Sequence, residues 1–287
     1  MSAAELPMPG VLSVQSRVAY GHVGNAAAVF ALQRLGIEAW ALDTVAFSNH
    51  TGHGQWRGSA ITASAVMDLF EGVAALGILP QLDAVLSGYL GDRATGPVLL
   101  DIVRRVRDAN PAALFCCDPV IGDDDTGPYV TDGIAEFFRE RALPAADIVT
   151  PNRFELEYLA GRPVGSIADA AEAAALLRAR GPRIVLVTSL APTFERLALL
   201  AAGPDETWVV ETPRLPVILN GCGDVAAAVF LAQLLRGAAL CEALALTAAA
   251  LFAVIERTAG LGRRELALVA AQDELAEPVR RFAPRRV

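Results

Sequence analysis

Five consecutive residues, Asn220-Gly221-Cys222-Gly223-Asp224, have the types and spacing that suit chemistry on an anion. The two glycines let the backbone turn tightly, so successive N–H groups can point at one spot. The Ala/Leu-rich stretch that follows predicts a helix, whose N-terminal N–H groups and dipole attract an anion. A carboxylate beside that site would repel an anion, so the presence of Asp224 there needs an explanation. Two interpretations of Asp224 stay open: it takes a proton from a hydroxyl group as a phosphoryl group arrives, or it caps the helix.

The chain has 287 residues and no lysine, since all 24 residues counted as Lys or Arg are arginine. This absence excludes a P-loop, whose motif places a lysine on the phosphates. It also excludes Schiff-base chemistry through a lysine amine. If the protein handles phosphate, then arginine, backbone N–H groups and a metal must balance the charge.

Two further glycine-containing segments carry polar residues. Residues 21–25, Gly-His-Val-Gly-Asn, open a helix but lack the spacing of a dinucleotide-binding fingerprint, so alone they indicate a turn. Residues 47–54 hold two of the three histidines, His50 and His53. A metal site there has no third ligand at a helpful spacing. A loop that binds a small molecule is the favoured interpretation.

Two carboxylates follow predicted strands. Asp118 ends a buried strand and precedes an acidic loop at 123–125; it either holds magnesium or forms an Asx turn. Asn152 and Glu155 stand before an apolar helix at the spacing of a capping box. Both a capping role and a ligand-binding role stay open for this pair.

Short β-rich runs alternate with helical stretches along the chain. Unbroken apolar runs such as residues 184–187 suit strands buried on both faces, which is typical of a parallel sheet. Strand–helix alternation favours right-handed crossovers. The expected strands cover residues 11–16, 38–45, 83–87, 113–118, 148–151 and 184–189, and the expected helices cover 25–35, 63–76, 96–108, 132–141, 153–160 and 167–179.

The pattern changes after Ser189. Residues 196–201 and 207–212 predict two strands at an antiparallel edge, followed by the helix of Asp224, one over about 240–257 and one near 264–272. No repeat or linker stands out, so we expect a flexible tail over residues 1–10 and one domain over 11–287. Ligands of such sheets bind at the carboxyl ends of the strands, where Ser16, Tyr89, Asp118, Thr150 and Thr188 would line one rim.

Composition narrows the class of protein. Hydrophobic residues make up 54% and charged residues 20%, which suits a domain with a buried core. The net charge of −8 disfavours a nucleic-acid-binding protein. The most apolar stretch, residues 243–255, is shorter than the roughly 20 residues that a membrane span needs. Four cysteines without zinc or disulfide spacing, and no visible signal peptide, favour the cytoplasm.

Taken in this order, these segments resemble the pyridoxal kinases of the ribokinase-like superfamily. The likeness covers nearly the whole chain, and its motifs stand at residues 11–25, 47–52, 86–91, 117–122, 150–156 and 221–224. The first two are the specific ones, whereas the last marks only the superfamily. The resemblance implies a three-layer α/β/α sandwich with a mostly parallel central sheet and an antiparallel edge.

The resemblance also implies an ATP-dependent kinase that phosphorylates the 5′-hydroxyl of pyridoxal, and of pyridoxine and pyridoxamine, in vitamin B6 salvage. Asp224 would be the base on that hydroxyl, and Gly221, Cys222 and Gly223 would form the anion hole. The vitamer would be bound by Ser16, Val23, Phe47, His50, Thr51 and Tyr89 together with Asp224. ATP would be bound by Asp118, Thr150, Asn152, Glu155, Thr188, Ser189 and Asn220, with Asp118 and Glu155 facing the metal.

Mg²⁺, a monovalent cation such as K⁺, and a homodimer are further implications of the resemblance. The chain departs from the family pattern at Cys222, where a small residue or threonine is usual. Its thiol is either activated by the helix N-terminus or buried and inert. Thr188 stands where some members carry a lysine. Two alternative functions stay open: a hydroxymethylpyrimidine kinase of the same fold, and a protein that binds the vitamer without turnover.

Overall fold

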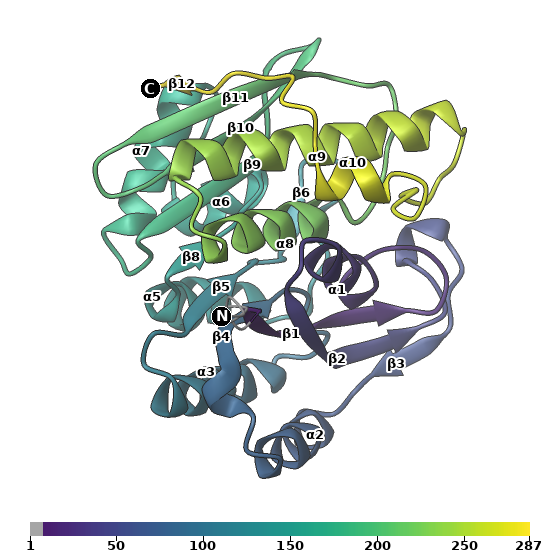
Figure 1. Cartoon of the computed structure of the whole chain (residues 1–287), viewed down its shortest axis with the longest axis vertical. Coiled ribbons are helices and arrows are strands. Elements are labelled where there is room, and N and C mark those ends of the chain that lie inside the picture. Colours follow the sequence, from purple (N-terminus) through teal and green to yellow (C-terminus); the bar gives the residue numbers. More distant parts are fainter. Residues whose placement is uncertain (1–7) are drawn as a thin grey trace, which may run out of the picture.

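The computed structural model describes residues 8–287, which build one large sheet between two layers of helices (Figure 1). Most of the tail predicted over residues 1–10 lies outside the described residues, and the first strand already begins at Gly10. The strand order is β12-β11-β10-β9-β8-β5-β4-β1-β2-β3. Among the described residues, no helix is long and apolar enough to cross a membrane.

The centre of the sheet is parallel and both of its edges are antiparallel. The parallel strands are β1 (Gly10–Val18), β2 (Glu38–Phe47), β4 (Leu82–Ser87), β5 (Leu114–Cys117), β8 (Ile148–Val149) and β9 (Ile184–Thr193). The antiparallel strands are β3 (Gly58–Ala60), β10 (Arg196–Ala202), β11 (Thr207–Pro213) and β12 (Arg285–Arg286). The predicted parallel sheet with an antiparallel edge is therefore confirmed.

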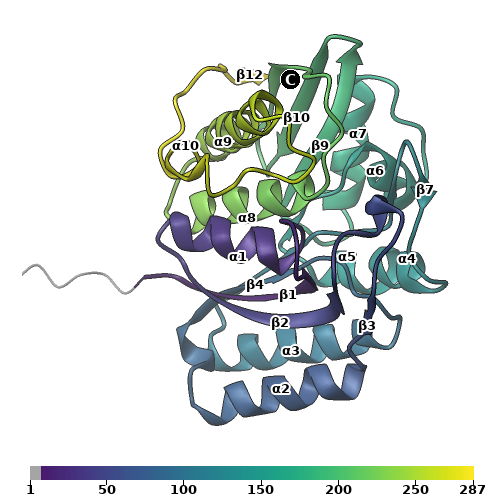
Figure 2. The same ribbon diagram turned by 90° about the vertical axis from the view of Figure 1, so that its right-hand side faces the viewer.

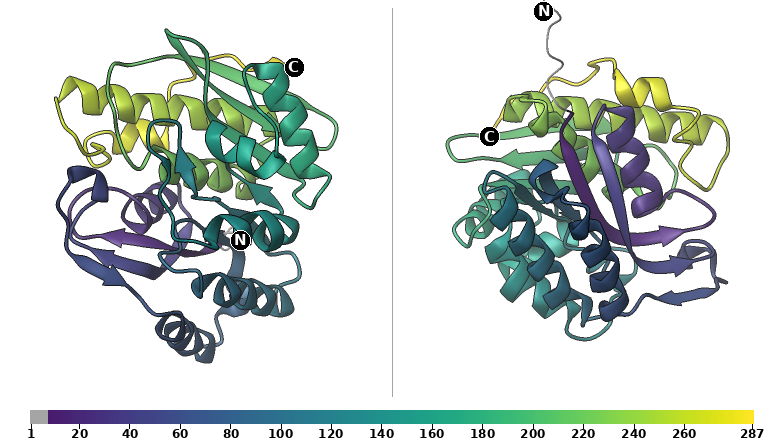
Figure 3. Two further views of the ribbon diagram at one scale, coloured as in Figure 1. Left: turned by 180° about the vertical axis from the view of Figure 1, so that it is seen from behind. Right: turned by 60° about the horizontal axis from the view of Figure 1, so that its bottom comes forward.

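Helices cover both faces of the sheet (Figures 2 and 3). One face carries α1 (Asn25–Arg34), α8 (Cys222–Leu235), α9 (Leu240–Gly260) and α10 (Gln272–Ala276). The other carries α2 (Ala63–Ala75), α3 (Thr95–Ala109), α4 (Ile134–Phe137), α6 (Arg153–Ala160) and α7 (Ile167–Arg178). Because strand side chains alternate between faces, Val11 and Cys116 enter the first core and Leu12 and Cys117 enter the second. This confirms the predicted three-layer α/β/α sandwich.

Several local predictions are wrong. The helix expected near 264–272 begins only at Gln272, because the hydroxyl of Thr258 accepts the N–H of Ala267 at 2.9 Å and holds the preceding segment in turns. The helix expected over 132–141 starts at Ile134 and widens into a π-helix over Phe138–Ala142, followed by α5 (Leu143–Ala145). The acidic loop expected at 123–125 is confirmed to within one residue, as the tip of a hairpin of β6 (Gly122–Asp123) and β7 (Gly127–Pro128).

Candidate active site

The N-terminus of α8 packs against the turn that follows β1. Gly221 is the N-cap of α8, with φ of 87°, and a Cβ on it would lie 2.1 Å from the carbonyl oxygen of His22. Only glycine fits that left-handed, crowded position. No part of the described chain outside the local helix lies within 4 Å of where a Cβ of Gly223 would stand, so this side of the turn is open.

Asp224 does not cap α8. It lies in the first turn of the helix, and its Oδ2 accepts the backbone N–H of Gly24 at 2.8 Å. The capping interpretation is therefore wrong, and the carboxylate is directed to the N-terminal turn instead. A Cβ on Gly24 would lie 2.1 Å from the carbonyl oxygen of Ser16 and 2.3 Å from its hydroxyl. Ser16, Gly24 and Asp224 thus gather at one place.

The environment of Asp224 makes it a better base. Burial raises its pKa from 3.8 to about 6, and the hydrogen bond from Gly24 offsets only part of that rise. The carboxylate is thus ionised at neutral pH and more basic than a solvated aspartate. These are the properties that proton transfer from an alcohol requires.

The segment expected to bind the vitamer lies beside the same helix N-terminus. Thr51 begins the short 3₁₀ helix η1 (Thr51–His53), and Nδ1 of His50 accepts the N–H of Gly52 at 3.1 Å. A Cβ on Gly52 would lie 3.2 Å from Nδ2 of Asn220. The loop and the Asn220–Asp224 run are therefore neighbours, although about 170 residues of chain separate them.

The other predicted vitamer residues lie around this centre. Val23 is buried between Gly21 and Gly24. Phe47 ends β2 and packs on Trp56 with 4.4 Å between ring centroids. Tyr89 follows β4, and burial raises the pKa of its hydroxyl. No hydrogen bond within residues 8–287 links the hydroxyl of Tyr89 to Asp224, and the parts of Phe47 and Tyr89 in the site stay predictions.

Three carboxylates form an acidic cluster at the carboxyl ends of the parallel strands. Oδ1 of Asp118 accepts the hydroxyl of Thr150 at 3.0 Å. Burial raises the pKa of Asp118 well above its usual range, and the charges of Glu155 and Asp224 raise it further. Burial also raises the pKa of Glu155 to about 8. The charges that act on Asp118 are both negative, and a cation bound nearby would offset them.

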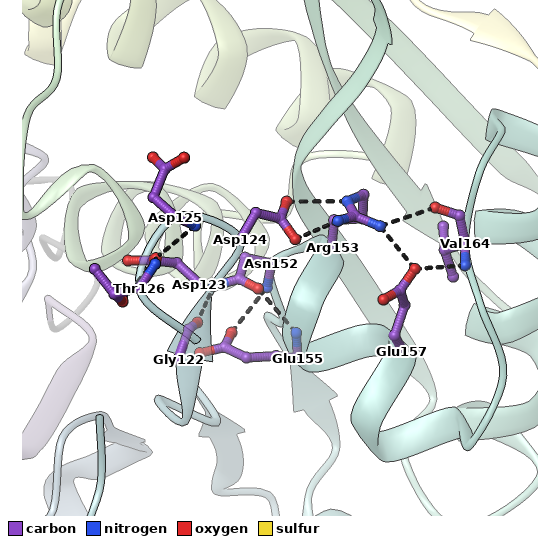
Figure 4. Close-up of polar contacts among 10 residues, drawn as sticks. All are labelled: Gly122, Asp123, Asp124, Asp125, Thr126, Asn152, Arg153, Glu155, Glu157 and Val164. Carbon is purple, nitrogen blue, oxygen red and sulfur yellow. Dashed lines mark hydrogen bonds and ion pairs between the residues drawn. The ribbon is translucent and has the colours of Figure 1, made fainter. Parts of the chain in front are cut away.

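Asn152 and Glu155 form a complete capping box at the start of α6 (Figure 4). Oδ1 of Asn152 accepts the N–H of Glu155, and Oε2 of Glu155 accepts the N–H of Asn152, each at 2.9 Å. The same two side chains reach the β6–β7 hairpin: Nδ2 of Asn152 donates to the carbonyl of Gly122 at 2.7 Å, and Oε1 of Glu155 accepts the N–H of Ile121 at 2.9 Å. The pair therefore holds the hairpin beside the acidic cluster as well as capping the helix.

The hairpin has a second anchor that the sequence did not reveal. Nε of Arg153 donates to Asp124 at 2.9 Å, and its guanidinium also reaches Glu157 on α6 at 2.7 Å (Figure 4). Tyr129 follows the hairpin; burial, and then the charges of Glu155 and Asp118, raise the pKa of its hydroxyl. The nearest signal in the sequence was the acidic run at 123–125, which gave no partner for it.

Thr188 and Ser189 lie in β9, the next strand along this side of the sheet. The backbone N–H of Thr188 donates to the carbonyl of Pro151 at 2.9 Å, and Thr188 also pairs with Asn152 in an isolated parallel bridge. Ser189 has φ of 58°, the one positive value among the non-glycine residues described. Such strain is common where a backbone is shaped for a ligand. Both residues lie on the predicted nucleotide side, next to Asn152.

Cys222 is an inert thiol in this environment. Burial raises its pKa to about 12, and the charge of Asp224 contributes to the rise. Both effects favour the neutral thiol over the thiolate. We expect Cys222→Ser to keep kcat within about threefold of wild type, since only one small, partly buried group changes. A loss of turnover comparable to that of an Asp224 variant would show that the thiol reacts.

Comparison with known proteins agrees with this geometry. Residues 36–268 match the phosphomethylpyrimidine kinase family. A pyridoxal kinase PdxY from Rubrobacter xylanophilus is 55% identical, with 96% of this chain and 97% of that protein covered, and one from Deinococcus radiodurans is 49% identical, with 96% of each covered. The structure of pyridoxal kinase from Leishmania donovani with ADP and pyridoxamine superposes with a TM-score of 0.91 at 30% identity, covering 97% of this chain and 99% of that one. The chain belongs to the pyridoxal kinase family, whose members are phosphotransferases.

Proposed function

We infer that this protein transfers the γ-phosphoryl group of ATP to the 5′-hydroxyl of pyridoxal, with pyridoxine and pyridoxamine as further acceptors. The observation that supports this most strongly is the position of Asp224. Its half-buried, ionised carboxylate lies in the first turn of α8 and accepts the N–H of Gly24 beside Ser16. Pyridoxal kinase from Leishmania donovani forms complexes with ADP and pyridoxamine and with ADP and pyridoxine, which supports ATP and a B6 vitamer as the substrates here.

The residues around the N-terminus of α8 have two tasks in this proposal: some bind the vitamer, and others stabilise the transferred phosphoryl group. Ser16, Thr51 and the neighbouring loop would orient the vitamer so that its hydroxyl faces Asp224. Asp224 would take the hydroxyl proton as the oxygen attacks the γ-phosphorus, and the bond to the leaving ADP oxygen would break. The N–H groups of residues 221–223 would stabilise the charge on the transferred group. This division needs positioning and charge balance rather than a covalent intermediate.

The acidic cluster fits a divalent cation that accompanies ATP. Asp118 would hold Mg²⁺ directly or through water, and Glu155 would assist from the α6 side; when bound, the ion balances phosphate charge that no lysine is present to balance. In the described part of the chain, no group of three His, Cys, Asp or Glu could hold a metal ion by itself. We further propose K⁺ as a monovalent cofactor, a homodimer and a cytoplasmic location.

The pH dependence of catalysis follows from Asp224. Because its pKa is about 6 and the base must be ionised, kcat/KM for the vitamer is expected to fall as pH drops through 6. The measurement is a pH profile from pH 5 to 9 at constant ionic strength, with saturating ATP. A profile that is flat down to pH 5 would contradict the assigned base.

The match to the phosphomethylpyrimidine kinase family makes hydroxymethylpyrimidine a second candidate acceptor. Side-by-side kcat/KM values for pyridoxal, pyridoxine, pyridoxamine and hydroxymethylpyrimidine decide between them. We expect the three vitamers to exceed the pyrimidine. A preference for the pyrimidine would reassign the substrate, and tight vitamer binding without turnover would identify a binding protein.

A further inference from the structure

Two of the three histidines of the chain, His22 and His53, contact one carboxylate, Glu265, which the reaction scheme above does not use. Glu265 lies in the irregular segment before α10, and its side chain is only 11% exposed. Oε1 lies 2.5 Å from Nε2 of His53, whose side chain is 21% exposed. Oε2 accepts the backbone N–H of His22 at 3.2 Å. The carboxylate therefore joins three segments that are far apart in the sequence.

The turn after β1 is built around this carboxylate. A Cβ on Gly21 would lie 1.9 Å from Oε2 of Glu265, so only glycine leaves the space that the carboxylate occupies. Gly21 also has φ of 97°, which favours glycine independently. The ring of Tyr20, a largely exposed residue, lies 6.1 Å from that of His53 in an edge arrangement.

The segment that carries Glu265 is firmly held. Leu266 is buried in the core and approaches within 3.2 Å of the Cβ position of Gly221. The N–H of Ala267 donates to the hydroxyl of Thr258 on α9, which in turn donates to the carbonyl of Val254. Glu265 is thus attached to the same rigid base as the N-terminus of α8.

Through His53, the contact with Glu265 reaches the loop that is expected to bind the vitamer. His53 is the last residue of η1, whose first residue is Thr51. The turn is short: the N–H of His53 donates to His50 at 3.1 Å, and that of Gly54 donates to Thr51 at 2.9 Å. The residues of η1 are largely exposed, so few packing contacts hold it in place. The Glu265–His53 contact joins η1 to a distant segment of the chain.

We propose that Glu265 is a positioning residue for the vitamer: through His53 it holds Thr51 and His50 against the N-terminus of α8. This rests on the proposed function for the identity of the ligand. Glu265 lies beside the loop and the turn after β1, whereas the nucleotide-side residues Asn152 and Thr188 lie on other strands and helices. Replacing Glu265 should therefore weaken the binding of the vitamer and leave the binding of ATP unchanged.

The test compares Glu265→Ala, Glu265→Gln, His53→Ala and the double alanine variant, with Glu274→Ala as a matched control from the same C-terminal region. Glu274 pairs with Arg257 at the surface of α9, away from the loop. For Glu265→Ala we expect the KM for pyridoxal to rise about tenfold, the size of one lost charge-assisted hydrogen bond, with the KM for ATP unchanged. Glu265→Gln should stay close to wild type, because its amide oxygen can accept from the N–H of His22 and its amide N–H can donate to a ring nitrogen of His53.

Two further readouts separate positioning from general destabilisation. The double alanine variant should be no worse than Glu265→Ala alone, since both changes break the same contact. Hydrogen exchange at the amides of His53 and Gly54 should accelerate in Glu265→Ala but not in Glu274→Ala. Equal rises in both KM values, effects that multiply in the double variant, or unchanged exchange would overturn the proposal. If Glu265→Ala does not fold, His53→Ala breaks the contact from the other side.

Exchange does not require turnover. An inactive wild-type protein would therefore refute the proposed function, while unchanged exchange would refute the role of Glu265. The two failures are distinguishable.

Discussion

Replacing Asp224 with asparagine is expected to lower kcat for pyridoxal phosphorylation by about 10²–10⁴-fold, the contribution of a positioned general base. Asparagine has the same shape, and its amide oxygen can still accept the N–H of Gly24, so the fold of the turn should persist. The KM for ATP should change little, because the change removes a proton acceptor rather than a phosphate contact. Steady-state kinetics with pyridoxal and ATP measure both values.

The same variant should be more stable than the wild type at neutral pH. Because the pKa of Asp224 is raised from 3.8 in the unfolded chain to about 6 in the fold, folding favours its protonated form. The stability that this group contributes is fully present below pH 3.8 and is lost as pH rises through 6. At pH 7.5 Asp224→Asn should gain about 1–2 kcal/mol after screening of the half-buried site, and the gain should shrink at pH 5. Thermal unfolding at the two pH values checks the stability prediction. For the kinetic prediction, an unchanged kcat in Asp224→Asn would refute the assigned base.

Gly24→Ala should be the second most damaging substitution. The new methyl group would meet both the carbonyl and the hydroxyl of Ser16, at 2.1 and 2.3 Å, so the turn must move. That movement displaces the N–H that holds Asp224, and a misplacement of about 1 Å in a reacting group costs about 10²-fold in rate. We expect a fall of about that size in kcat/KM for pyridoxal, measured at saturating ATP.

Gly36→Ala is the matched control for that experiment. Gly36 has φ of 75°, close in kind to the 54° of Gly24, but no atom lies within 4 Å of its Cβ position. It should therefore lose about 1–2 kcal/mol of stability to backbone strain and keep its activity. Equal effects of the two variants on kcat/KM would show that backbone strain alone, and not the collision with Ser16, explains the loss of activity in Gly24→Ala.

Elements with a strong local pattern could be predicted from the sequence. The parallel strands and the helices over 25–35, 63–76 and 153–160 agree with the structure to within a few residues, because apolar runs and caps act over one or two turns. The capping box of Asn152 and Glu155 was also visible as a spacing. Its second role, holding the β6–β7 hairpin, was not visible, because Gly122 is 30 residues away from Asn152.

The contacts that assemble the site join residues that are far apart in the sequence, so no local sequence pattern predicts them. Gly24 and Asp224 are 200 residues apart, and His53 and Glu265 are 212 apart. The segment near 264–272 was predicted as a helix because its composition favours one. Tertiary contacts of Thr258 and Glu265 hold it in turns instead. Short edge strands such as β3 and β12 likewise depend on their partners β2 and β11 rather than on their own residues.

The most direct test of the proposed function follows the transferred group itself. The purified chain is mixed with pyridoxal, Mg²⁺, K⁺ and ATP labelled at the γ-phosphorus, and the products are separated. The account predicts that the label moves to the 5′-oxygen of pyridoxal in equal amounts with ADP, and that Asp224→Asn does not transfer it on the same timescale. Label that stays on ATP, or that appears only as inorganic phosphate, would contradict the account.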